Sequence, residues 1–143
     1  MENIMKLEFA NKSCNENLAR LAAAAFVTPL DPTCEELSEI KTAISEAVTN
    51  AIIHGYEDSI GMVRLDGRIY GNIVEFTISD KGCGIQDVSK AMEPLYTTGG
   101  EERAGLGFAV MESMMDKIKV TSKPDKGTTI TLIKRISDKE NAK

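Results

Sequence analysis

The sequence predicts an α+β fold, a two-layer sandwich in which helices lie on one face of a mixed, mostly antiparallel sheet. Two observations predict it. Five short stretches alternate apolar and polar residues as half-buried strands do, and the stretches between them carry apolar residues at helical spacing. The 143 residues suit one domain, which we expect over 1–136, followed by a polar tail over 137–143.

The chain should begin with a strand over Met5–Phe9 and continue in a helix that reaches about Val27. Ser13 and Glu16 have the spacing of a capping box at the start of this helix. The apolar residues that predict its buried stripe are Leu18, Leu21, Ala22, Ala25 and Phe26. Two prolines within 28–33 end the helix, because proline cannot continue it.

The second helix is the longest, from about Cys34 to His54, and Gly55 is suited to end it. Thr33 and Glu36 form a second capping box at its start. At 100° per residue, the stripe that should face the sheet consists of Leu37, Ile40, Ile44, Val48 and Ala51.

A hairpin is expected next, with strands over 63–69 and 73–80 joined by the turn Gly71-Asn72. A stretch rich in glycine follows, and within it the residues near 87–92 predict one short helical piece.

The last third of the chain should hold one helix and two strands. Apolar spacing predicts the helix from Gly105 to about Met115. The strands are expected over 117–122 and 128–134, on either side of the turn at 124–127.

Composition excludes several classes of protein. Lys and Arg number 17 against 22 Asp and Glu, so the net charge of −5 argues against a nucleic-acid-binding protein, which needs a clustered positive surface. Apolar runs such as 21–27 are far shorter than the roughly 20 residues that cross a bilayer, and the first residues lack the pattern of a secretory signal. We therefore expect a soluble, cytoplasmic protein without a membrane partner.

Glu46 and Asn50 lie one turn apart on the long helix, opposite its apolar stripe. A Glu-x-x-x-Asn pair by itself is most often a solvated polar face. Ile53 shares this side of the helix, which indicates that the far end of the face is not simply in water.

Glycines cluster close to this polar pair in the predicted fold. Asp80-Lys-Gly82-Cys-Gly84 follows a strand directly, Gly105-Leu-Gly107 opens a predicted helix, and Gly127-Thr128 begins the last strand. Glycine lets a ligand approach the backbone, and a helix N-terminus offers free N–H groups to an anion. Each motif alone is weak, and neither the Walker nor the Rossmann spacing is present, so the ordered set carries the argument.

In this order the motifs resemble the ATP-binding GHKL superfamily, which includes gyrase, the Hsp90 chaperone, histidine kinases and MutL. The stretch 40–56 is similar to the N box of the anti-sigma-factor serine kinases. Further short matches resemble the sporulation branch of that family, at Leu7–Phe9, Leu30–Pro32, Pro94–Thr98 and Met111-Glu112. The resemblance runs from about Met5 to Arg135 and implies the GHKL, or Bergerat, sandwich.

The resemblance implies an ATP-dependent serine kinase that uses Mg²⁺. Glu46 would be the general base for a substrate serine hydroxyl, and Asn50 would ligate Mg²⁺. Asp80 would accept a hydrogen bond from the adenine amino group, and Thr128 would help to hold the purine. Gly82 and Gly84 would keep the pocket wall clear of side chains.

The resemblance also implies a lid over the phosphates at Pro94–Ala104, with Arg103 steadying the γ-phosphate. The further nucleotide contacts that it implies are Thr97, Thr98, Gly105, Leu106 and Gly107.

The implied partners are a sporulation sigma factor, an anti-anti-sigma factor as the kinase substrate, and a second copy of the chain in a homodimer. Arg20 would contact a partner. Two alternatives stay open, namely a kinase of a stress-response sigma factor and a module that sequesters its partner without catalysis. The chain has one histidine, His54, and thus no separate phospho-accepting histidine, which disfavours a histidine autokinase.

Overall fold

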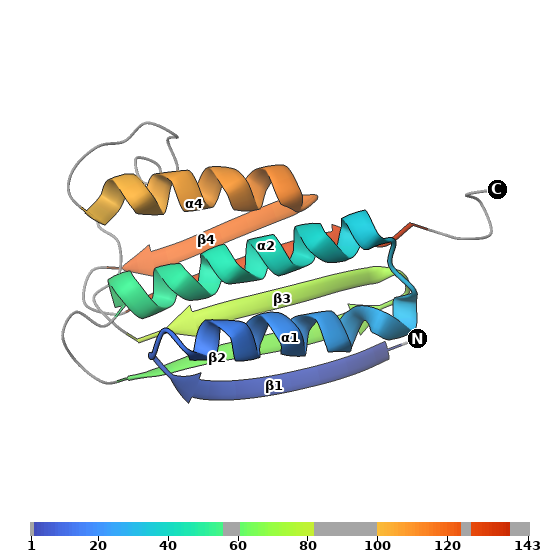
Figure 1. Ribbon diagram of the computed structural model, residues 1–143, viewed down its shortest axis with the longest axis horizontal. Helices are drawn as coiled ribbons and strands as arrows, with labels where there is room; N and C mark the ends of the chain where they lie inside the picture. Colours follow the sequence, from blue (N-terminus) through green and yellow to red (C-terminus); the bar gives the residue numbers. More distant parts are fainter. Residues whose placement is uncertain (1, 56–60, 82–99, 124–126, 138–143) are drawn as a thin grey trace.

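The computed structural model describes residues 2–55, 61–81, 100–123 and 127–137 (Figure 1). Five strands form one sheet in the order β1-β2-β3-β5-β4, and every pair of neighbours is antiparallel. The strands are β1 (Glu2–Ala10), β2 (Met62–Tyr70), β3 (Ile73–Asp80), β4 (Lys117–Lys123) and β5 (Gly127–Arg135). The α+β class is confirmed, and within the described residues the sheet is antiparallel throughout.

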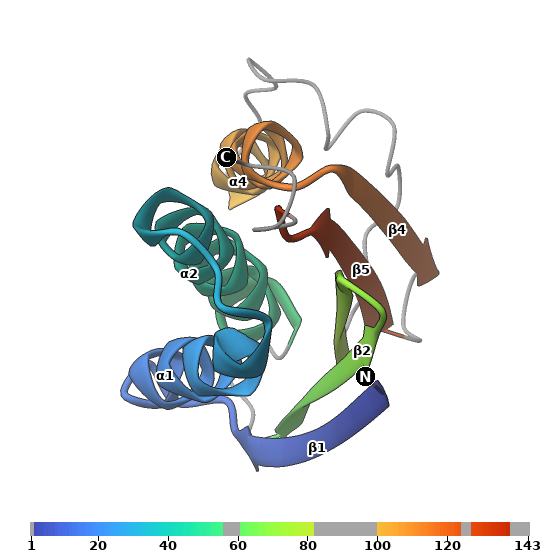
Figure 2. The ribbon, with the colours of Figure 1, turned by 90° about the vertical axis from the view of Figure 1, so that its right-hand side faces the viewer.

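Three helices cover one face of this sheet (Figure 2). The helical elements are α1 (Asn15–Val27), the 3₁₀ turn η1 (Thr28–Leu30), α2 (Cys34–Asn50), the π-helical turn η2 (Ala51–Gly55) and α4 (Gly100–Met114). α1 contacts β1 and β2, α2 lies between the other two helices, and α4 contacts β4. The apolar core fills the space between the two layers.

The start of α2 forms as the sequence predicts. The Thr33 hydroxyl accepts a hydrogen bond from Glu36 N, and a Glu36 carboxylate oxygen accepts one from Thr33 N, at 3.0 and 2.8 Å. The same carboxylate also accepts hydrogen bonds from the backbone and hydroxyl of Ser137. Burial raises the pKa of Glu36, but the hydrogen bonds from Thr33 and Ser137 outweigh it and lower that pKa below its ordinary value.

The capping box predicted for α1 is wrong. Cys14 is the N-cap, and no side chain caps the helix there. Glu16 instead accepts a hydrogen bond from the Thr49 hydroxyl of α2, at 3.1 Å. The Glu16 carboxylate therefore bonds to α2 and not to the backbone at the start of its own helix, as the capping box would require.

The stripe predicted for α1 is also largely wrong. Leu18 and Leu21 are 46% and 54% exposed, and Ala25 is exposed as well. Of the predicted stripe only Phe26 is buried, and the buried face is formed by Ala19, Ala23, Ala24, Phe26 and Val27. Small side chains let α1 approach its neighbours closely, so packing geometry overrides the preference for burying leucine.

Phe26 is the side chain that joins α1 to the sheet. Its ring packs edge-on against Phe76 of β3, with 6.1 Å between the ring centroids and 64° between the planes. Gly67 of β2 makes room for it, because a Cβ atom there would lie 2.8 Å from the Phe26 ring.

Two helix boundaries differ from the prediction. The α-helical part of the long helix ends at Asn50, and the chain continues to Gly55 as the π-helical turn η2. The helical segment as a whole still ends at Gly55, as the sequence predicts. The helical piece predicted near 87–92 lies outside the described residues.

The last helix begins at Gly100, five residues before the predicted Gly105. Residues 101–104 are Glu, Glu, Arg and Ala, which are good helix formers, and acidic residues favour the first turn. Gly105 and Gly107 therefore lie inside α4. The expectation that Gly105 opens the helix is wrong.

Candidate functional site

Buried polar side chains gather at one end of the sheet. Asp80 is the last residue of β3 and pairs with Thr128 at the start of β5. They are 7% and 5% exposed, and Asn50 at the end of α2 is 7% exposed. The turn η2, which follows Asn50 directly, contacts both β3 and β5, so the end of α2 reaches the same end of the sheet.

Ser122 of β4 extends this row of polar residues and was not predicted from the sequence. It pairs with Thr128 across the β4–β5 ladder, and the two hydroxyl oxygens are 2.9 Å apart. The Ser122 hydroxyl also donates to the Gly127 carbonyl oxygen at 3.1 Å. The signal in the sequence was the register of the predicted hairpin, which places Ser122 opposite Thr128.

Gly127 lets β5 start directly against Asp80. Its φ is +91°, and a Cβ atom there would collide with the Asp80 carbonyl and lie 2.7 Å from Lys81 Cα. Only glycine fits both the backbone angle and this approach. Gly127 therefore sets the spacing between Asp80 and the strand that carries Thr128.

Asn50 carries a buried oxygen without a partner. Its Oδ1 accepts no hydrogen bond from the part of the chain that the structure describes. Buried polar atoms are rarely left unsatisfied, and an exception calls for a functional explanation such as a missing ligand.

Glu46 precedes Asn50 by one turn and faces α4. The half-buried carboxylate lies beside Gly107, since a Cβ atom added there would be 3.0 Å from Glu46 Oε2. Asn50 is buried, so this face of the helix is not simply in water, as expected, although Ile53 itself is 41% exposed.

The structure thus brings together Asn50, Asp80 and Thr128 at the sheet end, with Glu46 and Gly107 at the α2–α4 contact. Gly82, Gly84, Thr97 and Thr98 lie outside the described residues. Arg103, Gly105 and Leu106 belong to α4. Their predicted contacts with a nucleotide stay predictions.

Arg20 lies on α1, apart from this polar cluster. Its guanidinium donates a hydrogen bond to the Asn17 amide oxygen at 2.6 Å. Arg20 is half-buried, whereas Leu18 and Leu21 of the same helix are exposed. Exposed apolar side chains on α1 are suited to a protein partner.

The residues present fit a magnesium ion bound together with phosphates. An amide oxygen is a hard ligand of the kind Mg²⁺ accepts, and Asn50 Oδ1 has no other partner among the described residues. Those residues contain no group of three or more His, Cys, Asp or Glu that could hold a metal.

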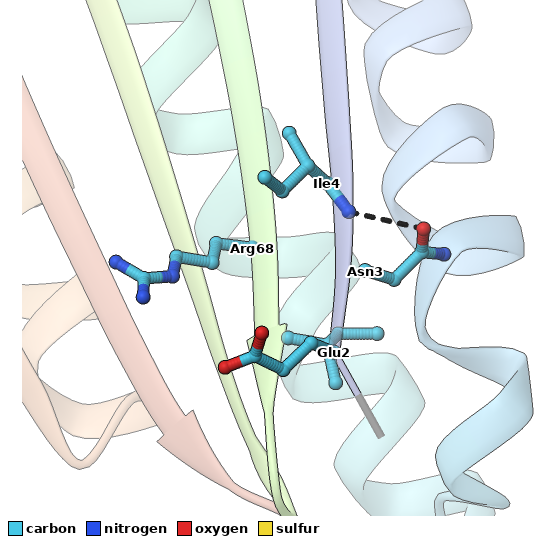
Figure 3. Close-up of a pocket in the computed structure, with 5 residues that line it drawn as sticks. Glu2, Asn3, Ile4 and Arg68 are labelled. Atoms are coloured by element: carbon cyan, nitrogen blue, oxygen red, sulfur yellow. Dashed lines mark hydrogen bonds between the residues drawn. The ribbon is translucent and has the colours of Figure 1, made fainter.

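A second surface feature lies elsewhere. On the sheet near the N-terminus, a shallow groove is lined by Glu2, Asn3, Ile4, Arg68 and Ile69 (Figure 3). The guanidinium carbon of Arg68 lies over the Tyr70 ring, 5.3 Å from the ring centroid. None of these residues was predicted for the functional site.

Comparisons with known proteins show the family to which the chain belongs. The model of the histidine kinase-like ATPase domain family matches residues 10–134. The chain is 53% identical to an anti-sigma F factor of Thermoanaerobacter sp. (strain X514), covering 96% of this chain and 97% of that relative. The chain belongs to the anti-sigma F factor family. An anti-sigma F factor of Anoxybacillus flavithermus is 52% identical over 96% of this chain and 95% of its own length.

Solved structures show the same fold as this family member at low identity. The RsbU and RsbW domains of a Mycobacterium tuberculosis protein match with a TM-score of 0.70 and 19% identity, covering 94% of this chain and 32% of that one. The histidine kinase domain of a blue-light activated kinase from Erythrobacter litoralis matches with a TM-score of 0.54 and 20% identity, over 75% and 48% of the two chains. Within the described part of the chain, no helix is long and apolar enough to cross a membrane.

Proposed function

We propose that this chain binds and inhibits a sporulation sigma factor of the sigma F type and is also a serine kinase. With Mg-ATP it phosphorylates, and so inactivates, an anti-anti-sigma factor. The family supports the sigma-factor partner and the use of ATP. The kinase step is supported by Glu46, which lies one turn before the buried Asn50, whose Oδ1 has no hydrogen-bond partner among the described residues.

The end of the sheet would hold the adenine. Asp80 would accept a hydrogen bond from the adenine amino group, which guanine lacks at that position, so the site would select adenine. Thr128 would hold the purine, and the Ser122 hydroxyl beside it restricts how Thr128 can point.

The end of α2 would hold the phosphates and the serine. Asn50 would ligate Mg²⁺, which when bound neutralises charge on the phosphate oxygens. Glu46 would take the proton of the substrate serine hydroxyl as that oxygen attacks the γ-phosphate. The helix places the two groups one turn apart, so a serine beside Glu46 is close to the phosphates bound near Asn50.

The other nucleotide contacts come from the family resemblance. Arg103 would steady the γ-phosphate, and Pro94–Ala104 would cover the phosphates. The remaining residues assigned to the nucleotide are Gly82, Gly84, Thr97, Thr98, Gly105, Leu106 and Gly107.

The outward side of α1 would bind protein. Arg20, on the same helix as the exposed Leu18 and Leu21, would contact the sigma factor or the anti-anti-sigma factor. Two copies of the chain would act as a homodimer.

The test is transfer of radiolabelled γ-phosphate from ATP to the anti-anti-sigma candidate encoded nearest to this chain. Glu46→Gln should abolish the phosphoserine on the partner. Glu35→Gln is the matched control, because it makes the same change in the exposed first turn of α2 and should leave transfer intact.

Other outcomes would contradict the proposal. Label on the chain itself would indicate an autokinase, and ATP binding without any transfer would indicate a nucleotide-gated sequestering module. Failure to bind ATP would overturn the assignment of the whole site.

A further inference from the structure

α4 passes so close to α2 that a side chain at position 107 would meet Glu46. A Cβ atom built on Gly107 lies 3.0 Å from Glu46 Oε2, shorter than an ordinary van der Waals contact. Beyond α4's own backbone and Gly107's chain neighbours, it is the only described heavy atom within 4 Å of that position. Among the described atoms, the Glu46 carboxylate oxygen is therefore the one that a side chain at position 107 would meet.

α4 is anchored, so it cannot simply move away from α2. Phe108, next to Gly107, and Met111, one turn further, are both fully buried in the core. At the end of the helix, buried Lys134 donates a hydrogen bond from Nζ to the Met114 carbonyl at 2.7 Å. The same Nζ is 3.6 Å from Glu39 of α2, so one cation connects the two helices.

The Glu46 side chain, in contrast, is not fixed by any polar contact with the described residues. No described residue forms a hydrogen bond or an ion pair with it. A carboxylate at the end of a flexible side chain yields before a packed helix does. If a methyl group were added at position 107, the carboxylate and not the backbone would have to shift.

We propose that Gly107 is a positioning residue for Glu46, because its missing side chain leaves the space in which the carboxylate stands. This role rests on the proposed function, in which Glu46 takes the proton of the substrate serine. This role is separate from the nucleotide contact proposed for Gly107, because it depends on the missing side chain and not on the backbone of that residue.

A double-mutant cycle with Gly107→Ala and Glu46→Asp tests this. At saturating Mg-ATP, Gly107→Ala should lower kcat for partner phosphorylation by roughly 10- to 100-fold through misplacement of the base. Aspartate is one methylene shorter and does not reach the added methyl group. On the Glu46→Asp background, Gly107→Ala should therefore cause little further loss of kcat.

An equal fold-loss of kcat on both backgrounds would overturn the proposal. Ser113→Ala is the control for alanine on α4, because Ser113 is exposed and bonds only within its own helix, to Val110 O. It should leave kcat unchanged.

Crystal structures of the wild type and of Gly107→Ala separate this proposal from the proposed function. The Glu46 carboxylate should be displaced in the variant, with Phe108 and Met111 unmoved. A shifted α4 or an unmoved Glu46 would contradict the positioning role. If the wild type transfers no phosphate to any partner, the kinase proposal fails, and the two structures still decide what Gly107 does.

Discussion

At the end of the sheet, single residues set the spacing of the strands that carry the polar cluster. Asp80, Thr128 and Ser122 form one row across three strands, and Gly127 sets the distance between two of those strands. A buried polar row is stable only when its members are held in place, so the glycine matters as much as the polar side chains.

Gly127→Ala should lower the free energy of unfolding by about 2–5 kcal/mol, because it adds a backbone collision to an unfavourable positive φ. Gly71→Ala is the matched control, since Gly71 also has a positive φ, of +63°, but has open space around it. It should cost only about 1–2 kcal/mol. Urea unfolding of both variants measures the difference, and equal losses would show that the contact with Asp80 contributes nothing.

At the scale of elements, two connections hold helices in place. The start of α2 is tied to the chain after β5 through Glu36 and Ser137. Lys134 ties the end of α4 to Glu39, which also lies near the start of α2. Each connection links segments that are distant in the sequence.

Glu36→Gln should remove a pH-dependent part of the stability, of about 1 kcal/mol near neutral pH. The folded pKa of Glu36 is lowered, so its contribution is fully present above the ordinary value of 4.5 and is lost as the pH falls through the folded pKa. The difference between wild type and variant should shrink accordingly below pH 4.5. Urea unfolding as a function of pH checks this, with Glu35→Gln as a neighbour that should leave the pH profile unchanged.

α1 turns exposed leucines outward, as expected of a helix that binds protein. Arg20→Ala should weaken binding of the sigma factor at least about tenfold and leave the Kd for ATP unchanged. Lys119→Ala removes the same charge from an exposed position on β4 and should have no effect. Calorimetry with the purified sigma factor measures both, and equal losses would assign the effect to net charge.

The whole molecule should respond to its nucleotide by mass action. Mg-ATP at about 100 times its Kd should stabilise the fold by about 2.7 kcal/mol, seen as a higher Tm. GTP should give no comparable shift, since Asp80 matches the adenine amino group. Asn50→Ala should lose the part of the ATP shift that depends on Mg²⁺, and an unchanged shift would exclude Asn50 as the ligand.

Local features were predictable from the sequence. The strands, the turn at Gly71-Asn72 and the capping box of Thr33 and Glu36 depend on residues that are neighbours along the chain. The candidates Glu46 and Asn50 were found because four residues on a helix bring side chains to one face.

The two features of α1 that failed depend on contacts between distant segments. Glu16 accepts a hydrogen bond from Thr49 of α2 and does not cap its own helix. Alanines, and not the leucines, form most of the packed face of α1. A pattern of neighbouring residues does not determine how closely two helices pack against each other.

The sequence by itself determined the fold class, the order of the elements and the identity of the polar residues, because alternation, helical spacing and ordered motifs are properties of the chain. Only the tertiary structure decided that Asn50 is buried with an oxygen that no described residue contacts by a hydrogen bond, that Ser122 supports Thr128, and that Gly107 faces Glu46. These are distances between elements, and the packing of the helices on the sheet sets them.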